Sequence, residues 1–291
     1  MPVRRNQSIF LQRINQTVNE LMRVALQPSY VLHSRPFRDS SVLLDLFTAE
    51  HGRTAVIGRG LSRKRRGGSL GALLQPFQPL LLSFGGRGDL LTLTAAETAG
   101  APIRLVHDAL ISGFYLNELL LRLTHRLDPQ PTLFSLYGDT LATLAGEEAV
   151  LEGSLRRFEY EALDQLGYGV DLRHDARTGS AIDEGAVYLF TPEYGFSAMR
   201  AESLSRDHSD PGSGAAESGM YFKGGELLAI ADGHYLRHAA TSKRLARLLL
   251  QPHLGDKPLR SRQMFVDMKN AGSQSDPPSP PAAVASGLRQ D

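Results

Sequence analysis

The sequence predicts an α+β protein in which a small N-terminal β-barrel is followed by an α-helical domain. Two features of the chain indicate this fold class. Five short apolar or alternating runs, separated by turn signals, occupy about 70 residues after Pro28. From Pro102 onward the apolar residues recur every three or four positions, which is the period of a helix. A chain of 291 residues is long enough to form two domains with a buried core.

Residues 1–27 are interpreted as an N-terminal extension that precedes the barrel. Its apolar residues fall roughly on one helical face, which permits a short packed or partner-binding helix, and a poorly ordered arm fits the sequence equally well. The members of this face are Ile9, Phe10, Ile14, Val18, Leu21 and Met22. Arginines interrupt the segment, so it lacks the apolar stretch of a secretory signal, and no run is long enough to predict a transmembrane helix.

Residues 28–100 are predicted to form the barrel. Short connections join the second run to the third through Gly52, and the fourth to the fifth through 85–88, where glycine supplies the positive φ of a tight reversal. The OB-fold is the commonest five-stranded barrel, although the periodicity alone also permits an SH3-like barrel. The five predicted strands are Tyr30–Ser34, Ser41–Thr48, Arg53–Arg59, Gln78–Phe84 and Asp89–Thr94.

Residues 101–268 are predicted to form the helical domain. In its first helix one face carries a row of leucines, and Asp128-Pro129 is expected to end that helix. The row consists of Leu116, Leu120, Leu123 and Leu127. Short connections between successive helices favour a bundle. The other predicted helices cover 133–144, 149–166 and 241–250, the last with Thr241 as its N-cap.

Two segments of this half of the chain lack a helical period. Residues 171–222 are expected to form a small irregular lobe, with a strand at Val187–Phe190, a turn at 193–195 and a loop at 205–219. Residues 269–291 contain closely spaced prolines and are expected to form a disordered tail.

Positive charge is concentrated in the barrel segment. Between residues 29 and 100, nine Lys or Arg face five Asp or Glu, which gives a net charge of +4, while the whole chain carries only +1. The rest of the chain is therefore negative. Any affinity for nucleic acid must come from this uneven distribution of charge rather than from the total.

The densest positive charge lies in a glycine-flanked run between two predicted strands. Such a loop can follow a phosphodiester backbone and release its condensed counterions. A basic run taken alone is equally well explained as a solvated loop, but its place on a predicted barrel with further basic residues favours nucleic-acid binding. The expected contacts are Arg35, Arg38, Arg53, Arg59, Arg63, Lys64, Arg65, Arg66 and Arg87.

Aromatic side chains on which bases stack are the usual second component of a single-strand site. The candidates are Tyr30, Phe37, Phe77 and Phe84, of which Phe37 lies between two arginines. Phe84, like Phe47, lies in an apolar run and is better explained as core. Since the chain has no tryptophan, we expect phosphate contact to dominate over base reading. Binding should then tolerate many sequences and depend strongly on salt.

The motifs of catalysis and cofactor binding are missing from the sequence. There is no phosphate-binding P-loop, and Gly85-Gly86-Arg87-Gly88 lies between two strands rather than before a helix, so it does not match a dinucleotide site. The absence of cysteine excludes disulfides, thiolate zinc sites and iron–sulfur clusters. His234 and His238 are two possible ligands, which is too few for a zinc site. We therefore expect that the protein binds no cofactor and is not an enzyme.

The predicted helix at 241–250 has leucines on one face and cations on another. An ordinary bundle helix with solvated charges explains this pattern, and so does a docking site for an acidic peptide. The candidate docking residues are Lys243, Arg244 and Arg247.

An ordered set of short motifs between residues 29 and 265 resembles the RecO family of bacterial DNA-repair proteins. Each motif is weak alone, but their order along the chain is specific. They are Val31-Leu32-His33-Ser34-Arg35-Pro36, Gly52-Arg53, Arg59-Gly60 with its basic loop, Leu74-Gln75-Pro76-Phe77, Phe84-Gly85-Gly86-Arg87-Gly88, Gly113-Phe114-Tyr115-Leu116-Asn117-Glu118-Leu119-Leu120, Leu155-Arg156-Arg157-Phe158-Glu159, Leu166-Gly167-Tyr168-Gly169, and Leu254-Gly255-Asp256-Lys257-Pro258-Leu259-Arg260-Ser261-Arg262.

The resemblance implies an N-terminal OB-fold that binds single- and double-stranded DNA, and annealing of complementary strands without ATP. It also implies contact with the acidic C-terminal tail of the single-stranded DNA-binding protein SSB, and action with RecR to load RecA on coated DNA. Such a protein is expected in the cytoplasm, at the nucleoid. Many relatives carry a four-cysteine zinc module in the segment that corresponds to 171–222. This chain has no cysteine, so its lobe is expected to be zinc-free.

Two other functions remain compatible with the residues themselves. One is an RNA-binding OB-fold protein, which competition between RNA and DNA of equal length would separate from a DNA-binding protein. The other is a protein–protein adaptor whose basic loop has no role in binding.

Overall fold

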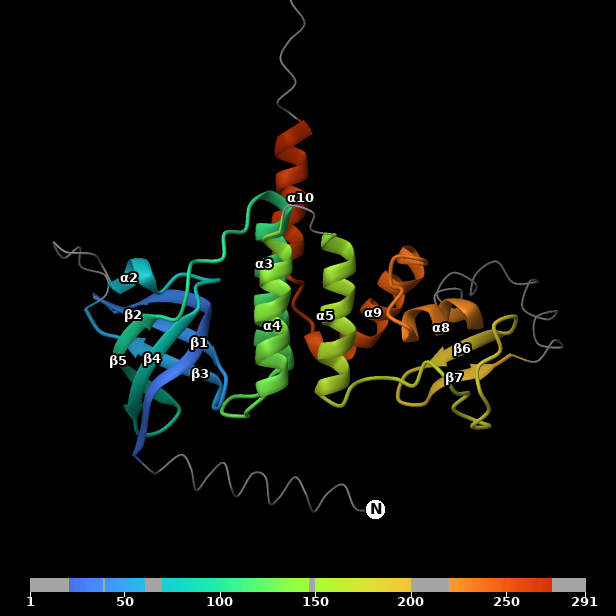
Figure 1. Ribbon diagram of the computed structural model, residues 1–291, viewed down its shortest axis with the longest axis horizontal. Coiled ribbons are helices and arrows are strands. Elements are labelled where there is room, and N and C mark those ends of the chain that lie inside the picture. Colours follow the sequence, from blue (N-terminus) through green and yellow to red (C-terminus); the bar gives the residue numbers. More distant parts are fainter. Residues whose placement is uncertain (1–20, 39, 61–69, 147–149, 200–219, 274–291) are drawn as a thin grey trace, which may run out of the picture.

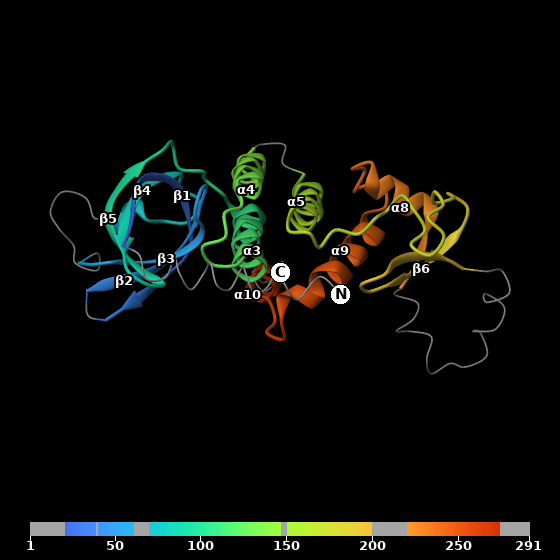
Figure 2. The ribbon, with the colours of Figure 1, turned by 90° about the horizontal axis from the view of Figure 1, so that it is seen from below.

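A computed structural model describes residues 21–38, 40–60, 70–146, 150–199 and 220–273. The described residues form a row, with the barrel at one end, helices in the middle, and a small sheet with further helices at the other end (Figure 1). The view turned by 90° shows the same order (Figure 2). The predicted fold class, a barrel followed by a helical domain, is confirmed.

Five strands close the barrel in the order β1-β2-β3-β5-β4. The strands are β1 Met22–Phe37, β2 Ser41–Thr48, β3 Gly52–Gly58, β4 Leu80–Gly86 and β5 Leu90–Thr98, and the short helix α2 Leu70–Leu73 precedes β4. The first half of β1 pairs with β4 and its second half with β2, both antiparallel, while β3 and β5 pair in parallel. Because one long strand pairs on both sides, the sheet closes as it does in an OB-fold.

The first strand begins earlier than the sequence predicted. It starts at Met22, which pairs with Gly86, so residues 22–27 belong to the barrel and not to an extension of 27 residues. The register then shifts before Gln27, and Leu26 has a positive φ of 49°. This irregularity breaks the alternation by which a strand is recognised in a sequence. Residues 1–20 lie outside the described residues.

Alternate side chains of the strands enter two different cores. One core fills the barrel and consists of Val31, Leu44, Leu46, Val56, Leu74, Leu80, Leu82, Phe84 and Leu91. Tyr30 and Phe47 point to the other side of their strands and join the core of the helical domain. The Tyr30 and Tyr137 rings meet edge to face, with 5.1 Å between their centroids. The barrel and the helices are therefore packed together rather than only tethered.

Three helices form the middle of the molecule: α3 His107–Leu123, α4 Pro131–Leu144 and α5 Leu151–Gln165. The second and third agree with the predicted ranges. The first ends at Leu123, and the expectation that it continues through Leu127 is wrong. Leu127 has a φ of 55°, and its N–H donates to the Arg53 carbonyl, so the segment after α3 is drawn out along the start of β3.

The lobe contains the strands β6 Val187–Thr191, β7 Gly195–Ala198 and β8 Tyr221–Lys223, in the order β7-β6-β8, followed by the helix α8 Gly224–Ala231. The strand and the turn predicted near residue 190 are confirmed. The other two strands were not predicted because three or four residues carry too little periodicity. The predicted loop at 205–219 lies outside the described residues.

Backbone hydrogen bonds to Asp175 hold part of this lobe together. Its Oδ1 accepts the N–H groups of Arg177 and Thr178, each at 2.8 Å, and its Oδ2 accepts that of Ala198 at 2.6 Å. No group of three or more His, Asp or Glu suitable for a metal occurs among the described residues. One buried carboxylate, 3% exposed, thus joins two segments of the lobe that lie 23 residues apart in the chain.

The last two helices are α9 Ala239–Leu254 and α10 Arg260–Ser273. The prediction that Thr241 is an N-cap is wrong, since α9 begins at Ala239 and His238 occupies the cap position without a side-chain hydrogen bond. The helix α10 was not predicted. It includes residues 269–273, which were expected to be disordered, and 274–291 lie outside the described residues.

Candidate functional site

The outer surface of β1, β2 and β3 carries most of the described basic residues of the barrel. Arg35 is paired with Leu43 of β2, which is in turn paired with Ile57 of β3, so all three side chains share one face. In the neighbouring row, Leu44 and Val56 belong to the barrel core, so their side chains point inward. Arg35 therefore points outward, and Phe37, two residues further along β1, does the same.

Four residues gather at one end of this face and are here called the basic end: Arg35, Phe37, Arg38 and Arg59. Pairing of Val42 with Gly58 places Arg59 directly beyond the last residue of β3. The three arginines are exposed, and Phe37 is half-buried. The Arg38 guanidinium carbon lies 5.3 Å from the centroid of the Phe37 ring, a distance at which the ring attracts the cation.

The predicted basic loop follows directly from this end. Arg59 and Gly60 are the last described residues before the segment 61–69, so Arg63, Lys64, Arg65 and Arg66 lie outside the described residues. Arg87 occupies a different position. It precedes β5, which begins opposite Ala55, so it lies at the other end of β3 from Arg59.

A second group of charges lies where the barrel meets the helices, and its members are called the junction cluster: His33, Asp45, Arg53 and Arg126. The Asp45 carboxylate lies 3.9 Å from the His33 imidazole and 3.7 Å from the Arg126 guanidinium. The His33 and Arg126 side chains remain about half exposed, at 47% and 49%, while Asp45 is 17% exposed. The Asp45 carboxylate is thus covered by the His33 and Arg126 side chains, which face solvent.

Arg53 is less accessible than the sequence suggested. Burial lowers the pKa of its guanidinium, the like charge of Arg126 lowers it further, and Asp45 partly offsets both. Its Nε is buried and has no hydrogen-bond partner in the described part of the chain. Since six residues of extended strand separate Arg53 from Arg59, the junction cluster and the basic end span about 20 Å of one surface.

Sequence reasoning missed Arg126 and His33 as parts of this surface. Arg126 belongs to the connection between α3 and α4, and nothing in the sequence places that connection against β3. His33 gave a weak signal, because it alternates with Arg35 and Phe37 on the same predicted strand. Three of the four candidate stacking aromatics are buried: Tyr30, Phe77 and Phe84 are between 1% and 9% exposed. Only Phe37 is available to a base.

A groove of about 640 Å³ lies between α3, α5, α9 and α10. Its apolar lining includes Leu250, Leu254 and Phe265, and its cations are Arg156, Lys243, Arg247, Lys257 and Arg262. On the floor Glu159 accepts hydrogen bonds from the Tyr115 hydroxyl at 2.5 Å and from Arg156 at 2.6 Å. Burial raises the pKa of Glu159, although the Arg156 charge and the Tyr115 hydroxyl oppose this shift.

The three cations expected on α9 are placed differently from one another. Lys243 and Arg247 are exposed and line this groove, and Lys243 lies 3.5 Å from Glu152. Arg244 is engaged inside the fold: its guanidinium lies 4.2 Å from the Phe222 ring centroid and donates to the Tyr221 carbonyl at 2.7 Å. Arg244 therefore holds α9 against β8 instead of facing a partner.

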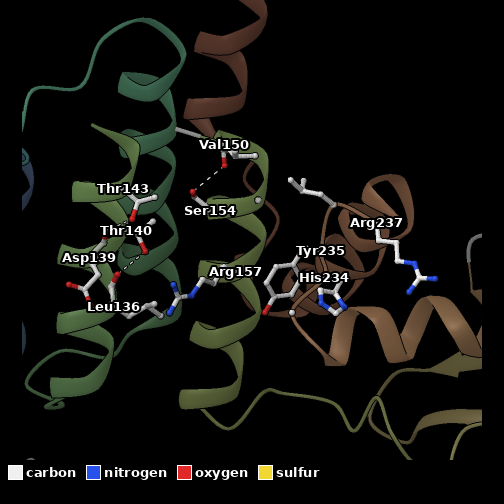
Figure 3. A pocket seen from close by; sticks show the side chains of 13 residues that line it. Leu136, Asp139, Thr140, Thr143, Val150, Ser154, Arg157, His234, Tyr235 and Arg237 are labelled. Carbon is white, nitrogen blue, oxygen red and sulfur yellow. Dashed lines mark hydrogen bonds between the residues drawn. The ribbon is translucent and has the colours of Figure 1, made fainter. Parts of the chain in front are cut away.

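A second cavity, of about 680 Å³, lies between α4, α5 and the turn after α8 (Figure 3). Its lining comes from three parts of the fold, and its charged or titratable residues are Asp139, Arg157, His234, Tyr235 and Arg237. Arg157 is already paired with Glu161 at 2.7 Å. The cavity brings together no nucleophile and base joined by a hydrogen bond, so its described residues do not suggest a reaction.

Two family models together match most of the chain. The model described as the N-terminal part of recombination protein O matches residues 22–102, and the C-terminal model matches 106–263. The boundary at 22 coincides with the start of β1. No helix among the described residues is long and apolar enough to cross a membrane.

Curated relatives give the same result over nearly their full length. The chain is 44% identical over 256 residues to the DNA repair protein RecO of Nitrosococcus oceani, an alignment that covers 87% of this chain and 98% of that protein. It is 43% identical over 247 residues to the RecO protein of Haemophilus influenzae, with 84% and 97% covered. The corresponding protein of Methylococcus capsulatus is 42% identical over 245 residues, with 84% and 93% covered.

Proposed function

Because the chain belongs to the RecO family of DNA repair and recombination proteins, we propose that the outer face of its barrel binds single- and double-stranded DNA and brings complementary strands together without ATP. The observation that carries this proposal is the continuous surface made by the basic end and the junction cluster. It presents exposed arginines on a five-stranded OB-fold, and the predicted basic loop begins at its edge.

Strand annealing by this surface needs charge neutralisation and no covalent step. Arginines that contact the phosphates of one strand release its counterions and reduce its repulsion for a second strand. The second strand can then approach and pair. Since only one aromatic side chain of the candidate set is accessible, phosphate contacts supply most of the affinity, and sequence preference should be weak. The protein therefore acts as a mediator rather than as an enzyme.

The groove beside α9 supports the partner that the family implies. An acidic peptide that ends in apolar residues would find cations on the walls of the groove and leucines and Phe265 within it. We propose that the C-terminal tail of SSB docks here, with Lys243 and Arg247 among its contacts. The protein would then reach coated DNA in the cytoplasm, at the nucleoid, where it would act with RecR to load RecA.

The DNA-binding proposal is tested with the whole protein and labelled single strands at several salt concentrations. If about five phosphates are contacted, the logarithm of the affinity should fall with the logarithm of salt with a slope near −3.5. Replacing Arg63, Lys64, Arg65 and Arg66 by Ala should flatten this slope and slow the annealing of SSB-coated complementary strands. RNA of equal length, added as a competitor, tests the RNA-binding alternative.

A matched control removes the same charge elsewhere. Arg157, Arg173, Arg177 and Arg237 are exposed outside the barrel, and their replacement by Ala changes the net charge equally. An unchanged slope in the loop variant would remove the loop from the site. If the wild-type protein binds SSB but shows no affinity for DNA even at low salt, the chain is an adaptor and the DNA-binding proposal is wrong.

The docking proposal has a separate test. A labelled SSB-tail peptide should bind the whole protein. Arg247→Glu should lower the affinity for this peptide by about tenfold or more. Arg237→Glu, on an exposed arginine outside the groove, is the control for charge and should bind as the wild type does. Equal binding by the two variants would place the tail elsewhere.

A further inference from the structure

An ion pair between two residues of α3 makes hydrogen bonds to both α9 and α10, the two helices that form one wall of the docking groove. Glu118 and Arg122 are one helical turn apart, and the Arg122 Nη2 donates to the Glu118 Oε1 at 2.8 Å. Their side chains are only 15% and 18% exposed, so water screens the pair little. Neither residue lines the groove itself.

Glu118 caps the start of α10. The N–H of Arg260 donates to its Oε1 at 3.0 Å, and the N–H and hydroxyl of Ser261 donate to its Oε2 at 3.0 and 2.9 Å. The first N–H groups of a helix have no partner inside that helix, and a carboxylate there also meets the positive end of the helix dipole. A side chain of α3 thus does what a cap residue in the sequence before α10 would otherwise do.

Arg122 caps the end of α9 and the connection that follows. Its Nη1 donates to the carbonyl of Leu254, the last residue of α9, at 2.8 Å and also to the carbonyl of Lys257. Its Nη2 donates to the carbonyl of Pro258 at 3.0 Å. Carbonyls at the end of a helix have no partner inside that helix, and a guanidinium with several N–H donors can satisfy more than one of them.

We propose that Glu118 and Arg122 are positioning residues for the docking of an acidic peptide, because they fix the distance between the groove cations of α9 and those of α10 and the connection before it. This inference rests on the proposed docking function. Lys257 lies within the segment that Arg122 holds, and Arg262 lies one residue beyond the pair of N–H groups that Glu118 caps. Arg247 is carried by α9 on the other side of the groove.

The packing of α10 explains why two residues have this effect. In Figure 1 α10 lies beside α3, and its upper part extends beyond the top of α3. Met264 and Val266 are 43% and 45% exposed, so much of the apolar surface of α10 is not buried. Its attachment therefore depends more than usual on the polar contacts of its first turn. When the ion pair is removed, Lys257 and Arg262 lose a fixed position and must be ordered by the peptide.

The test uses the whole protein and the labelled SSB-tail peptide. Glu118→Gln keeps the shape of the side chain but removes its charge, and Arg122→Lys keeps the charge but removes the planar set of donors. Each is expected to weaken peptide binding by about tenfold. Hydrogen–deuterium exchange of residues 256–267 should rise in both variants, and the rest of the protein should exchange as in the wild type.

A control is the i,i+4 pair of α5, which is more exposed to solvent. Glu161 accepts a hydrogen bond from Arg157 at 2.7 Å, outside the groove, and Glu161→Gln should leave both peptide binding and exchange at 256–267 unchanged. Peptide binding equal to wild type in Glu118→Gln would overturn this inference alone. Failure of the wild-type protein to bind the peptide would overturn the docking proposal and this inference with it.

Discussion

Arg126, in the connection between α3 and α4, lies 3.7 Å from the carboxylate of Asp45 on β2. This contact joins a cation of the helical domain to the outer face of the barrel. The contact is supported by backbone pairing: Arg53 and Arg126 form an isolated parallel β-bridge, and the Leu127 N–H donates to the Arg53 carbonyl at 2.9 Å. A strand of DNA that follows the basic end would meet Arg126 after leaving β1.

Replacing Arg126 by Ala should weaken single-strand binding at low salt and reduce the magnitude of the salt slope by about 1, because one phosphate contact is lost. Fluorescence anisotropy with a labelled oligonucleotide at four or more salt concentrations measures this slope. Arg173→Ala is the control, since Arg173 is exposed in the lobe and pairs with Asp232 there. If the slopes of the two variants agree, the DNA path does not reach the junction cluster.

Replacing Gly52 by Ala should destabilise the barrel where it meets the helical domain. Gly52 has a φ of +60°, and a Cβ built there would lie 1.9 Å from the Asp128 carbonyl oxygen. The substitution combines backbone strain with a steric clash, and we expect it to lower the free energy of unfolding by about 2–4 kcal/mol. Urea denaturation followed by circular dichroism gives this value.

Gly179→Ala is the matched control for backbone strain alone. Gly179 has a φ of +71°, and nothing lies within 4 Å of a Cβ built there, so only the strain remains. It should lower the free energy of unfolding by about 1 kcal/mol. Equal losses in the two variants would show that the contact between Gly52 and Asp128 is unimportant for stability.

Asn117 is expected to be the strongest polar link between the helices and the barrel. Its Nδ2 donates to the Leu32 carbonyl at 2.9 Å, and its Oδ1 accepts the Tyr137 hydroxyl at 2.5 Å, all in a buried site. Asn117→Ala leaves both partners unsatisfied and should lower the free energy of unfolding by about 2–4 kcal/mol. Tyr137→Phe removes one hydrogen bond only and should cost about 1 kcal/mol.

Thermal or urea unfolding of the two single variants and the double variant tests this arrangement. Because the residues share a hydrogen bond, the losses should not add, and the double variant should resemble Asn117→Ala. Strict additivity would mean that the two side chains contribute independently.

The lobe should loosen in acid through Asp175. Burial alone would raise the pKa of this carboxyl, but the N–H groups of Ala198, Thr178 and Arg177 stabilise its charged form and bring the pKa below the usual 3.8. A carboxyl with a lowered folded pKa stabilises fully above its unfolded value and loses this contribution as the pH falls through its folded value. Exchange of the amides of Arg177, Thr178 and Ala198 should therefore accelerate, relative to the intrinsic rate, as the pH falls below 3.8.

Asp175→Asn should show the same faster exchange already at neutral pH and a weaker dependence on acid. Asp232→Asn, at an exposed position that pairs with Arg173, is the control and should keep the protection of these three amides. Slow exchange of the three amides in Asp175→Asn at neutral pH would contradict the role of this carboxylate.

Several elements of the fold could be predicted from the spacing of apolar residues along the chain, because that spacing decides which face of a strand or helix is buried. The second strand, Ser41–Thr48, has the predicted bounds, and the helix that ends at Leu144 has its predicted end. In both, the spacing of apolar residues matches the face that is buried. Leu127 shows where this reasoning fails: it continues the leucine row of α3, yet it lies beyond the helix because its backbone pairs with Arg53.

The residues of the candidate site were also predicted only in part from the sequence. The sequence predicted Arg35, Arg38 and Arg59 as basic residues of one barrel, and pairing of β1, β2 and β3 brings these three together. It gave no reason to separate Arg87 from them or to place Arg244 against Phe222. It also did not predict α10, whose first turn is capped by Glu118, 142 residues earlier in the chain.

By itself the sequence determined the order of a barrel and a helical domain, the excess of positive charge on the barrel and the membership of the family, because these depend on composition, periodicity and ordered motifs along the chain. The tertiary structure alone decided which cations face solvent together, which are used inside the fold, and which carboxylates cap distant segments. Those outcomes depend on strand register and on contacts between residues far apart in the chain, and local sequence carries no record of either.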